Sequence, residues 1–277
     1  MDADVLLVGC GELGTDVGRR LAARGHRVLG LRRRADLVPY PLRALSVDLT
    51  RSSPDLPPLD LAYLVVALTA KPRTEQAYRA TYVEGMARAL DALEAVGQGP
   101  RRAVLVSSTG VFGDLDPAVV ADESTPAHPA DGPAEMLLQA EQAFSERVPG
   151  GTVLRLSGLY GHGSARLVDQ VRAGSVTDPN RWTNRIHRDD AAAAVVHLLT
   201  RVTPPEALYI GTDDEPALLG DVTAHLAAQL GAPAPPASDE GMGHGKRFSN
   251  ARLRASGWVP GFPTYREGYK GLSAEST

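Results

Sequence analysis

Short apolar runs alternate with helix-like stretches along the first half of the chain. Residues 3–9 are almost continuously apolar, which is typical of a strand covered on both faces. Leu13, Val17 and Leu21 then recur every four residues and predict a helix with one apolar face. Further strands are predicted at 27–31, 44–47, 61–67, 103–106 and 152–156, and helices at 74–96 and 134–148. This alternation predicts an α/β fold with a doubly wound parallel sheet.

The pattern is less regular after residue 157. A helix is predicted at 191–199, a strand at 207–210, a second helix at 217–230, and mobile loops at 233–236 and 241–245. We therefore expect a sheet domain over residues 1–157 and a smaller C-terminal domain over residues 158–277. The boundary between them is soft, because chains of this kind often cross from one domain to the other.

A glycine-rich turn, Gly9-Cys10-Gly11-Glu12-Leu13-Gly14, joins the first strand to the first helix. In this setting Gly9 permits the tight turn, Gly11 lets a pyrophosphate approach the backbone, and Gly14 lets helix and strand pack closely. The free N–H groups of the helix would then bind the anion. The turn predicts a Rossmann-type dinucleotide site; the alternative is a turn without a ligand. Cys10 is interpreted as a small core residue rather than a redox-sensitive thiol.

The end of the second predicted strand indicates which dinucleotide binds. An NAD site places an acid there to bind the ribose 2′-OH, but this strand ends in Arg32-Arg33-Arg34. Guanidinium groups pair with a 2′-phosphate, so Arg32 and Arg33 favour NADP. NAD stays possible through Asp36, which lies beyond the expected place, and the arginines could also form an ordinary solvated turn.

Composition narrows the class of protein. The chain has 277 residues, 43% hydrophobic and 22% charged, with a net charge of −4. This charge gives no general attraction to nucleic acid or to anionic membranes, so neither is expected as a partner. Cys10 is the sole cysteine, and the apolar run at the start is too short for a signal or membrane segment, so we expect a cytoplasmic protein. The spacing of histidines and cysteine predicts no metal site.

Several further motifs are spread over nearly the whole chain. They are Val47-Asp48-Leu49, Ser107 to Gly113 (SSTGVFG), Glu123 to Pro126 (ESTP), Arg155 to Gly161 (RLSGLYG), Trp182 to Asp190 (WTNRIHRDD) and Lys246 to Leu253 (KRFSNARL). With the glycine turn, they make the sequence similar to the extended short-chain dehydrogenase/reductase superfamily. Within it, the chain resembles the NAD-dependent epimerase/dehydratase branch, and a bacterial subgroup that lacks the Tyr-x-x-x-Lys motif.

The resemblance implies roles for individual residues. Asp48 and Leu49 would contact the adenine, and Ala67 and Leu68 would run beside the pyrophosphate and ribose. Ser107 would lie near the nicotinamide ribose, and Ser108 matches the catalytic Ser/Thr of the family. Each residue also has a structural alternative: Asp48 could cap a turn, and the two serines could satisfy backbone groups at a strand end.

The chain departs from the family pattern where the Tyr-x-x-x-Lys motif is expected. Counting back from Glu141 puts Pro133 at the tyrosine position and Leu137 at the lysine position. Hydride transfer then lacks its usual proton partner. Substitutes on the substrate side are His187 and Tyr160, for which a structural role is the alternative, and then His162. Tyr82, from a helix facing the sheet, is a further candidate.

Two functions from different classes follow. The first is an NADP-preferring oxidoreductase or epimerase-like enzyme, in which residues 1–157 bind the dinucleotide and residues 158–277 bind a small, sugar-like substrate. The second is a non-catalytic NADP-binding redox sensor or regulator. A nucleic-acid-binding regulator is a third and weaker possibility. The protein is expected to be a monomer or a homodimer, and the sequence does not identify the substrate.

Overall fold

The computed structural model describes residues 4–97, 99–161 and 166–270. The chain divides into two compact units. The first consists of Met1–Gly113, Ala127–Arg155 and Ala192–Tyr209, and the second of Asp114–Pro126, Leu156–Ala191 and Ile210–Thr277. One crossing, between Arg155 and Leu156, lies beside the boundary predicted after residue 157, and the chain also crosses at four other points.

A seven-stranded sheet runs in the order β11-β7-β5-β4-β1-β2-β3, which confirms the predicted α/β fold. The pairs β3–β2, β2–β1, β1–β4 and β4–β5 are parallel. The strands are β1 (Val5–Val8), β2 (Val28–Arg32), β3 (Arg43–Ser46), β4 (Tyr63–Val66), β5 (Arg102–Ser108), β7 (Thr152–Leu156) and β11 (Leu208–Gly211). The strand order reverses between β1 and β4, and in open α/β sheets such a reversal marks the crevice where ligands bind.

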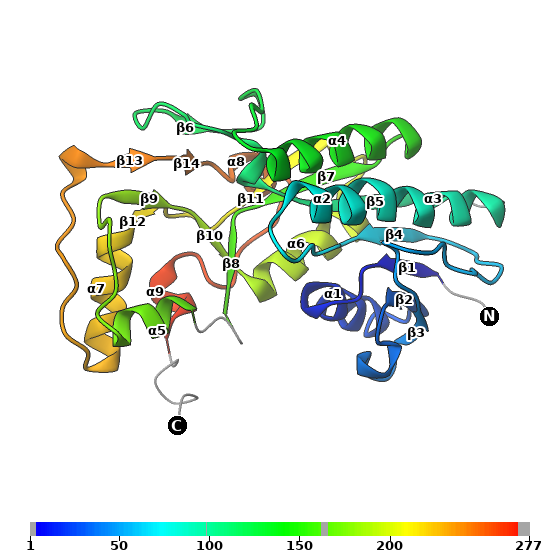
Figure 1. Cartoon of the computed structure of the whole chain (residues 1–277). Helices are drawn as coiled ribbons and strands as arrows, with labels where there is room; N and C mark the ends of the chain where they lie inside the picture. The colour runs from blue at the N-terminus through cyan, green and yellow to red at the C-terminus, as the bar shows by residue number, and fades with distance from the viewer. Residues whose placement is uncertain (1–3, 98, 162–165, 271–277) are drawn as a thin grey trace. The chain divides into compact units, whose positions relative to one another are not determined.

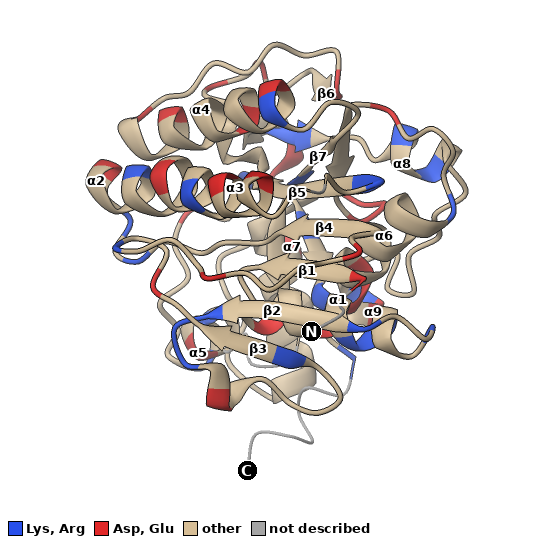
Figure 2. Ribbon diagram, turned by 90° about the vertical axis from the view of Figure 1, so that its right-hand side faces the viewer, with Lys and Arg blue, Asp and Glu red and all other residues tan. Residues whose placement is uncertain are grey.

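Helices cover both faces of the sheet in the first unit. Helix α1 (Glu12–Ala22) packs on one face, and α2 (Glu75–Tyr78), α3 (Met86–Ala95) and α4 (Gly132–Arg147) lie on the other (Figure 1). The helix predicted at 74–96 is interrupted by a π-helical segment, Arg79–Gly85. Helices α3 and α4 run side by side, and Arg147 on α4 forms ion pairs with two acids of α3 at 2.6 and 2.8 Å (Figure 2).

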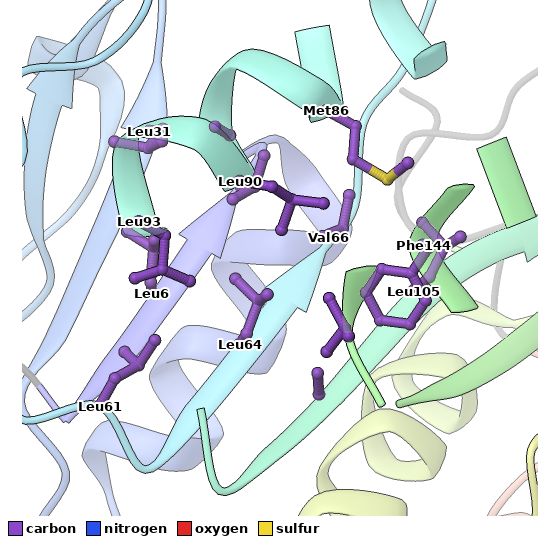
Figure 3. Close-up of a cluster of buried hydrophobic side chains, with 14 of the residues drawn as sticks. Leu6, Leu31, Leu61, Leu64, Val66, Met86, Leu90, Leu93, Leu105 and Phe144 are labelled. Carbon is purple, nitrogen blue, oxygen red and sulfur yellow. The ribbon is translucent and has the colours of Figure 1, made fainter. Parts of the chain in front are cut away.

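A continuous apolar core lies between the sheet and the helices α3 and α4. Alternate residues of β1, Leu6 and Val8, point to this side and pack with Leu64 and Val66 of β4. Figure 3 shows how α3 and α4 complete the cluster, with Met86, Leu90, Leu93 and Phe144. Burial of one such side chain contributes about 1.5–3 kcal/mol, so this cluster is a large source of stability for the first unit.

The second unit contains short strands and helices around its own apolar core. Strand β6 (Val120–Ala121) pairs with β14 (Arg247–Phe248), β8 (Gly158–Tyr160) with β10 (Arg185–His187), and β9 (Arg181–Thr183) with both β12 (Ala217–Leu218) and β13 (His244–Gly245). The helices are α5 (Arg166–Arg172), α7 (Leu219–Leu230), α8 (Ala251–Ala255) and α9 (Tyr265–Gly268), while α6 (Arg188–Thr200) contains residues of both units.

Two details of this unit differ from the sequence prediction. The helix predicted at 217–230 begins at Leu219, because Ala217 and Leu218 pair with β9 as a short strand. The segment predicted as a loop at 241–245 contains the end of a 3-10 turn, Glu240–Met242, and strand β13. Over the described part of the chain, no helix has both the length and the apolar character needed to cross a membrane.

Candidate functional site

The backbone at the carboxyl end of β1 requires glycine at two positions. Gly9 has φ +96°, and a Cβ there would lie 2.4 Å from the carbonyl oxygen of Ala67, which follows β4. A Cβ on Gly14 would lie 2.3 Å from the carbonyl oxygen of Gly9. Neither approach is possible for a larger residue. The turn is therefore packed tightly against the neighbouring strand and its own helix.

Gly11 differs from these two glycines because nothing lies within 4 Å of a Cβ built on it. It is exposed and precedes α1, whose start has no side-chain cap. The first N–H groups of a helix lack intrahelical partners and attract anions. Space beside Gly11 and a helix start whose N-cap residue has no side chain fit the pyrophosphate of a dinucleotide, which the first backbone N–H groups of α1 would bind.

Cys10 in the same turn is fully buried, with its Sγ atom 3.6 Å from Oγ1 of Thr15. Burial raises the pKa of the Cys10 thiol, which disfavours the reactive thiolate. These observations fit the interpretation of Cys10 as a small core residue.

The arginine cluster lies at the carboxyl end of β2. Arg33 and Arg34 are exposed, whereas Arg32 is half-buried and donates a 3.4 Å hydrogen bond to the carbonyl of Leu37. The bond from Ser46 to Arg33 uses the Arg33 carbonyl, so it leaves the guanidinium unaffected. Asp36 is also exposed, in a 3-10 turn. The Arg33 guanidinium can thus bind an anion without breaking a bond that the fold needs.

Asp48 and Leu49 have structural roles of their own. Asp48 accepts hydrogen bonds from the backbone N–H and the hydroxyl of Thr50, and the hydroxyl bond lowers the pKa of the Asp48 carboxyl. Leu49 is 8% exposed and packs in the apolar core. Asp48 therefore caps a turn. A contact of either residue with adenine stays a prediction, as do the contacts of half-buried Ala67 and Leu68 with pyrophosphate and ribose.

The end of β5 is held by a buried ion pair that the sequence did not indicate. Arg155 on β7 donates two hydrogen bonds to Glu141 on α4 at 3.1 Å and one at 2.7 Å. Ser107 donates to the same carboxylate at 2.5 Å, and the Arg155 guanidinium lies 4.9 Å from the centre of the Phe112 ring. Because its hydroxyl hydrogen is used here, a contact of Ser107 with a dinucleotide would have to come from its backbone or its oxygen lone pairs.

Ser108 is placed differently from Ser107. Its hydroxyl oxygen accepts a 3.0 Å hydrogen bond from the N–H of Gly110, and the side chain is partly exposed. A serine hydroxyl has one hydrogen to donate in addition to its acceptor sites, and the bond from Gly110 does not use it. Ser108 can therefore donate to an oxygen of a bound molecule.

Tyr160 and His187 lie together in the second unit, whereas Ser108 belongs to the first. Their ring centres are 5.4 Å apart, both side chains are buried, and His187 also stacks on Phe262 at 3.8 Å. The N–H of Asp189 donates to Nδ1 of His187 at 3.2 Å, and the Tyr160 hydroxyl donates to the carbonyl of Thr264 at 3.3 Å.

Burial raises the pKa of Tyr160 far above its ordinary value. Tyr160 is therefore a poor proton acceptor near neutral pH, which leaves His187 as the better candidate of the pair. His162 lies outside the described residues. Tyr82, in the π-helical segment, accepts a 3.5 Å hydrogen bond from the N–H of Ala70, and burial raises its pKa as well.

A comparison with models of known protein families shows the family to which this chain belongs. The model of the NAD dependent epimerase/dehydratase family matches residues 5–211. This chain belongs to the NAD dependent epimerase/dehydratase family. The match includes the turn at β1, both serines at the end of β5 and the Glu141–Arg155 pair, so these features belong to the part of the chain that the family shares.

Individual members of the family are similar over different lengths. A Kitasatospora kifunensis protein named dTDP-6-deoxy-L-talose 4-dehydrogenase (NAD(P)(+)) is 30% identical over 192 residues, which cover 62% of this chain and 60% of the relative. A Methylobacillus flagellatus structure, itself provisionally described as an NAD-dependent epimerase/dehydratase, is 35% identical, with a TM-score of 0.82 and 98% of each chain covered. A human epimerase family protein solved with NADPH is 20% identical, with a TM-score of 0.78 over 99% of this chain and 100% of that one; it supports the fold alone.

Removal of one partner from the buried pair tests its contribution to stability. Glu141→Gln leaves Arg155 charged and buried without a counter-charge, so we expect the free energy of unfolding to fall by about 3–5 kcal/mol. The matched control is Glu146→Gln, an exposed change on the same helix, which should cost less than about 0.5 kcal/mol. Urea denaturation followed by circular dichroism measures both, and equal midpoints would contradict the assigned role.

Proposed function

We propose that this family member binds NADP at the carboxyl ends of β1, β2 and β4 and is an oxidoreductase or epimerase-like enzyme acting on a small, sugar-like substrate. The observation that carries the proposal is the contrast among the three glycines. Gly9 and Gly14 are packed against backbone oxygens, whereas Gly11 faces open space beside an uncapped helix start. That arrangement fits a cradle for a pyrophosphate.

The residues of the turn and of the neighbouring strand ends would hold the cofactor. Backbone N–H groups at Gly11, Glu12 and Leu13 would bind the pyrophosphate. Arg33, and Arg32 after release of its weak bond to Leu37, would pair with the 2′-phosphate. The exposed Asp36 is the alternative that would favour NAD.

When bound, a nicotinamide dinucleotide would supply or accept a hydride. Ser108 would donate its hydroxyl hydrogen to the oxygen at the reacting carbon and so stabilise negative charge that develops there. Gly110 fixes the orientation of that hydroxyl. The Glu141–Arg155 pair holds the preceding residue, Ser107, and thereby the end of β5.

The proton would have to come from outside α4, because this helix contains neither tyrosine nor lysine and has Pro133 and Leu137 in its first turns. We assign the proton transfer to His187, because histidine is the side chain that most often transfers protons near neutral pH. The composition of α4 also favours the second candidate function, an NADP-binding sensor or regulator without turnover.

The comparisons support the enzyme over the sensor. The Kitasatospora relative is named as a dehydrogenase of a nucleotide-linked deoxysugar that uses NAD(P)(+), and its match to this chain includes about three fifths of its length. A sugar-like substrate is proposed here on that similarity. A cytoplasmic location is part of the same proposal, supported by a single cysteine that is buried.

Cofactor choice is tested at Arg33. Replacement by alanine removes a charge-assisted contact to the 2′-phosphate, so NADP affinity should fall by about 1.5–3 kcal/mol while NAD affinity stays almost unchanged. Isothermal titration calorimetry with both dinucleotides measures the two effects. Arg19→Ala, an exposed change about two turns along α1, is the control and should alter neither. Equal losses for NADP and NAD would refute the phosphate role.

Catalysis is tested at Ser108. Once NADPH absorbance identifies a substrate among sugars, ketones and quinones, Ser108→Ala should lower kcat by about 10²-fold, the effect of one lost transition-state donor. Ser124→Ala is the control, since that exposed serine donates its hydroxyl hydrogen to Asp122 in a surface turn of the second unit. A wild-type rate in Ser108→Ala would remove the role assigned to this hydroxyl. Tight NADP binding with no turnover in a broad screen would favour the sensor.

A further inference from the structure

The second unit contains a pocket that the cofactor proposal does not use. Its volume is about 260 Å³, enough for a small organic molecule. All of its lining residues belong to the second unit, among them Trp182, Asp213, Asp214, Arg247 and Ser249. The pocket can therefore be described without reference to the first unit.

Arg247 supplies the positive charge of this pocket. Its guanidinium stacks 4.9 Å from the Trp182 ring centre and donates a 2.6 Å hydrogen bond from Nη2 to the carbonyl of Pro117. The Nε–H group is buried and has no hydrogen-bond partner among the described residues. A buried donor without a partner costs about 1–3 kcal/mol, so an acceptor that reaches this atom would bind favourably.

Asp213 provides a second buried polar atom. The residue is 2% exposed, and its Oδ2 atom has no hydrogen-bond partner within the described part of the chain. Burial raises the pKa of Asp213 to about 8, even though the Arg185 guanidinium acts to lower it. Other charged or titratable groups that act on it are Asp214, Glu215, Tyr160 and Tyr269. At neutral pH Asp213 is therefore protonated and can donate a hydrogen bond.

The other polar residues of the pocket are Ser249, Asn250 and Asp214. The Ser249 oxygen accepts from the N–H of Ala251 at 3.1 Å, which leaves its hydroxyl hydrogen to donate. Asn250 donates both to the carbonyl of Thr212 and to Asp214, and Asp214 also lies 3.7 Å from the Arg254 guanidinium. Val120, Pro216 and Phe248 give the pocket apolar walls. The lining thus combines one cation, Arg247, with several donors, apolar surface and the Asp214 carboxylate, whose charge is met by Asn250 and Arg254.

We propose that this pocket binds a small organic carboxylate with a compact apolar body. The carboxylate oxygens would accept from Arg247, Asp213 and Ser249, and the apolar part would pack against Val120 and Phe248. A single cation, a carboxylate already present at Asp214, and apolar walls favour a monocarboxylate over inorganic phosphate, which carries more negative charge and no apolar surface. The proposal rests on the second unit alone, so it stands or falls independently of dinucleotide binding.

Benzoate is a suitable probe, with benzamide as its uncharged analogue and inorganic phosphate as the competing anion. The whole protein is titrated without dinucleotide, and the indole N–H resonance of Trp182 is followed by NMR, with the buried Trp258 as an internal reference. We expect benzoate to shift the Trp182 signal, and benzamide and phosphate to bind at least tenfold more weakly. No shift with benzoate, or an equal response to benzamide or phosphate, would overturn the proposal.

The contribution of the Arg247 guanidinium is tested by a substitution. Arg247→Gln should weaken benzoate binding at least tenfold, whereas Arg172→Gln, an exposed change on α5, should leave it unchanged. Because Arg247 packs on Trp182, the fold of the variant is checked by circular dichroism. Unchanged benzoate affinity in folded Arg247→Gln would contradict the proposal.

The pH dependence gives a readout that does not depend on Arg247. Benzoate stays ionised between about pH 6.5 and pH 9, so a change in affinity over this range reports on the protein. Loss of the Asp213 proton above pH 8 puts a negative charge beside the ligand, and binding should weaken about tenfold by pH 9. Asp213→Asn keeps an N–H donor and cannot ionise, so its affinity should stay flat. The same decline in Asp213→Asn as in wild type would show that the assignment of Asp213 is wrong.

Discussion

Close backbone packing at the carboxyl end of β1 is the constraint on which the proposed site depends. Gly9 reaches to within contact of the carbonyl after β4, and Gly14 brings α1 against Gly9 itself, so neither position has room for a Cβ. The consequence is a helix whose N-terminus is held where the strand order reverses. The adjacent position, Gly11, is left with open space around it, and this difference between neighbouring glycines is what a ligand cradle requires and a merely compact turn does not.

The second structural constraint is the buried ion pair between Glu141 on α4 and Arg155 on β7. It uses the hydroxyl of Ser107 and flanks Phe112, so the turn that holds Ser108 is fixed on both sides. A hydroxyl held in this way can polarise an oxygen, but α4 offers no tyrosine or lysine to move the accompanying proton. We therefore propose that the proton comes from a residue outside α4; the alternative is a protein that senses its cofactor without turnover.

Much of the first unit could be predicted from its sequence, because buried parallel strands are continuous apolar runs and the glycine turn has a distinctive spacing. The prediction of secondary structure was incomplete where contacts between residues far apart in the sequence determine the local structure. Nothing in 74–96 signals the π-helical segment, and the two-residue strands of the second unit exist only through their partners. The bond from Ser107 to a carboxylate 34 residues away and the packing of Leu49 in the core also had no signal in the sequence, while the predicted contacts of both residues with the cofactor stay predictions. The buried Oδ2 atom of Asp213, which has no hydrogen-bond partner among the described residues, likewise has no sequence signature.

The cradle formed by the glycine turn is the central claim, and calorimetric titration of NADPH into Gly11→Val tests it most directly. Because a Cβ at Gly11 meets no protein atom, the variant should fold like wild type, while the added isopropyl group fills the place of the pyrophosphate. The control is Gly99→Val, at another glycine with open space around its Cβ position. The account predicts that Gly11→Val loses NADPH binding and that Gly99→Val keeps it. Undiminished affinity in a folded Gly11→Val protein would contradict the account.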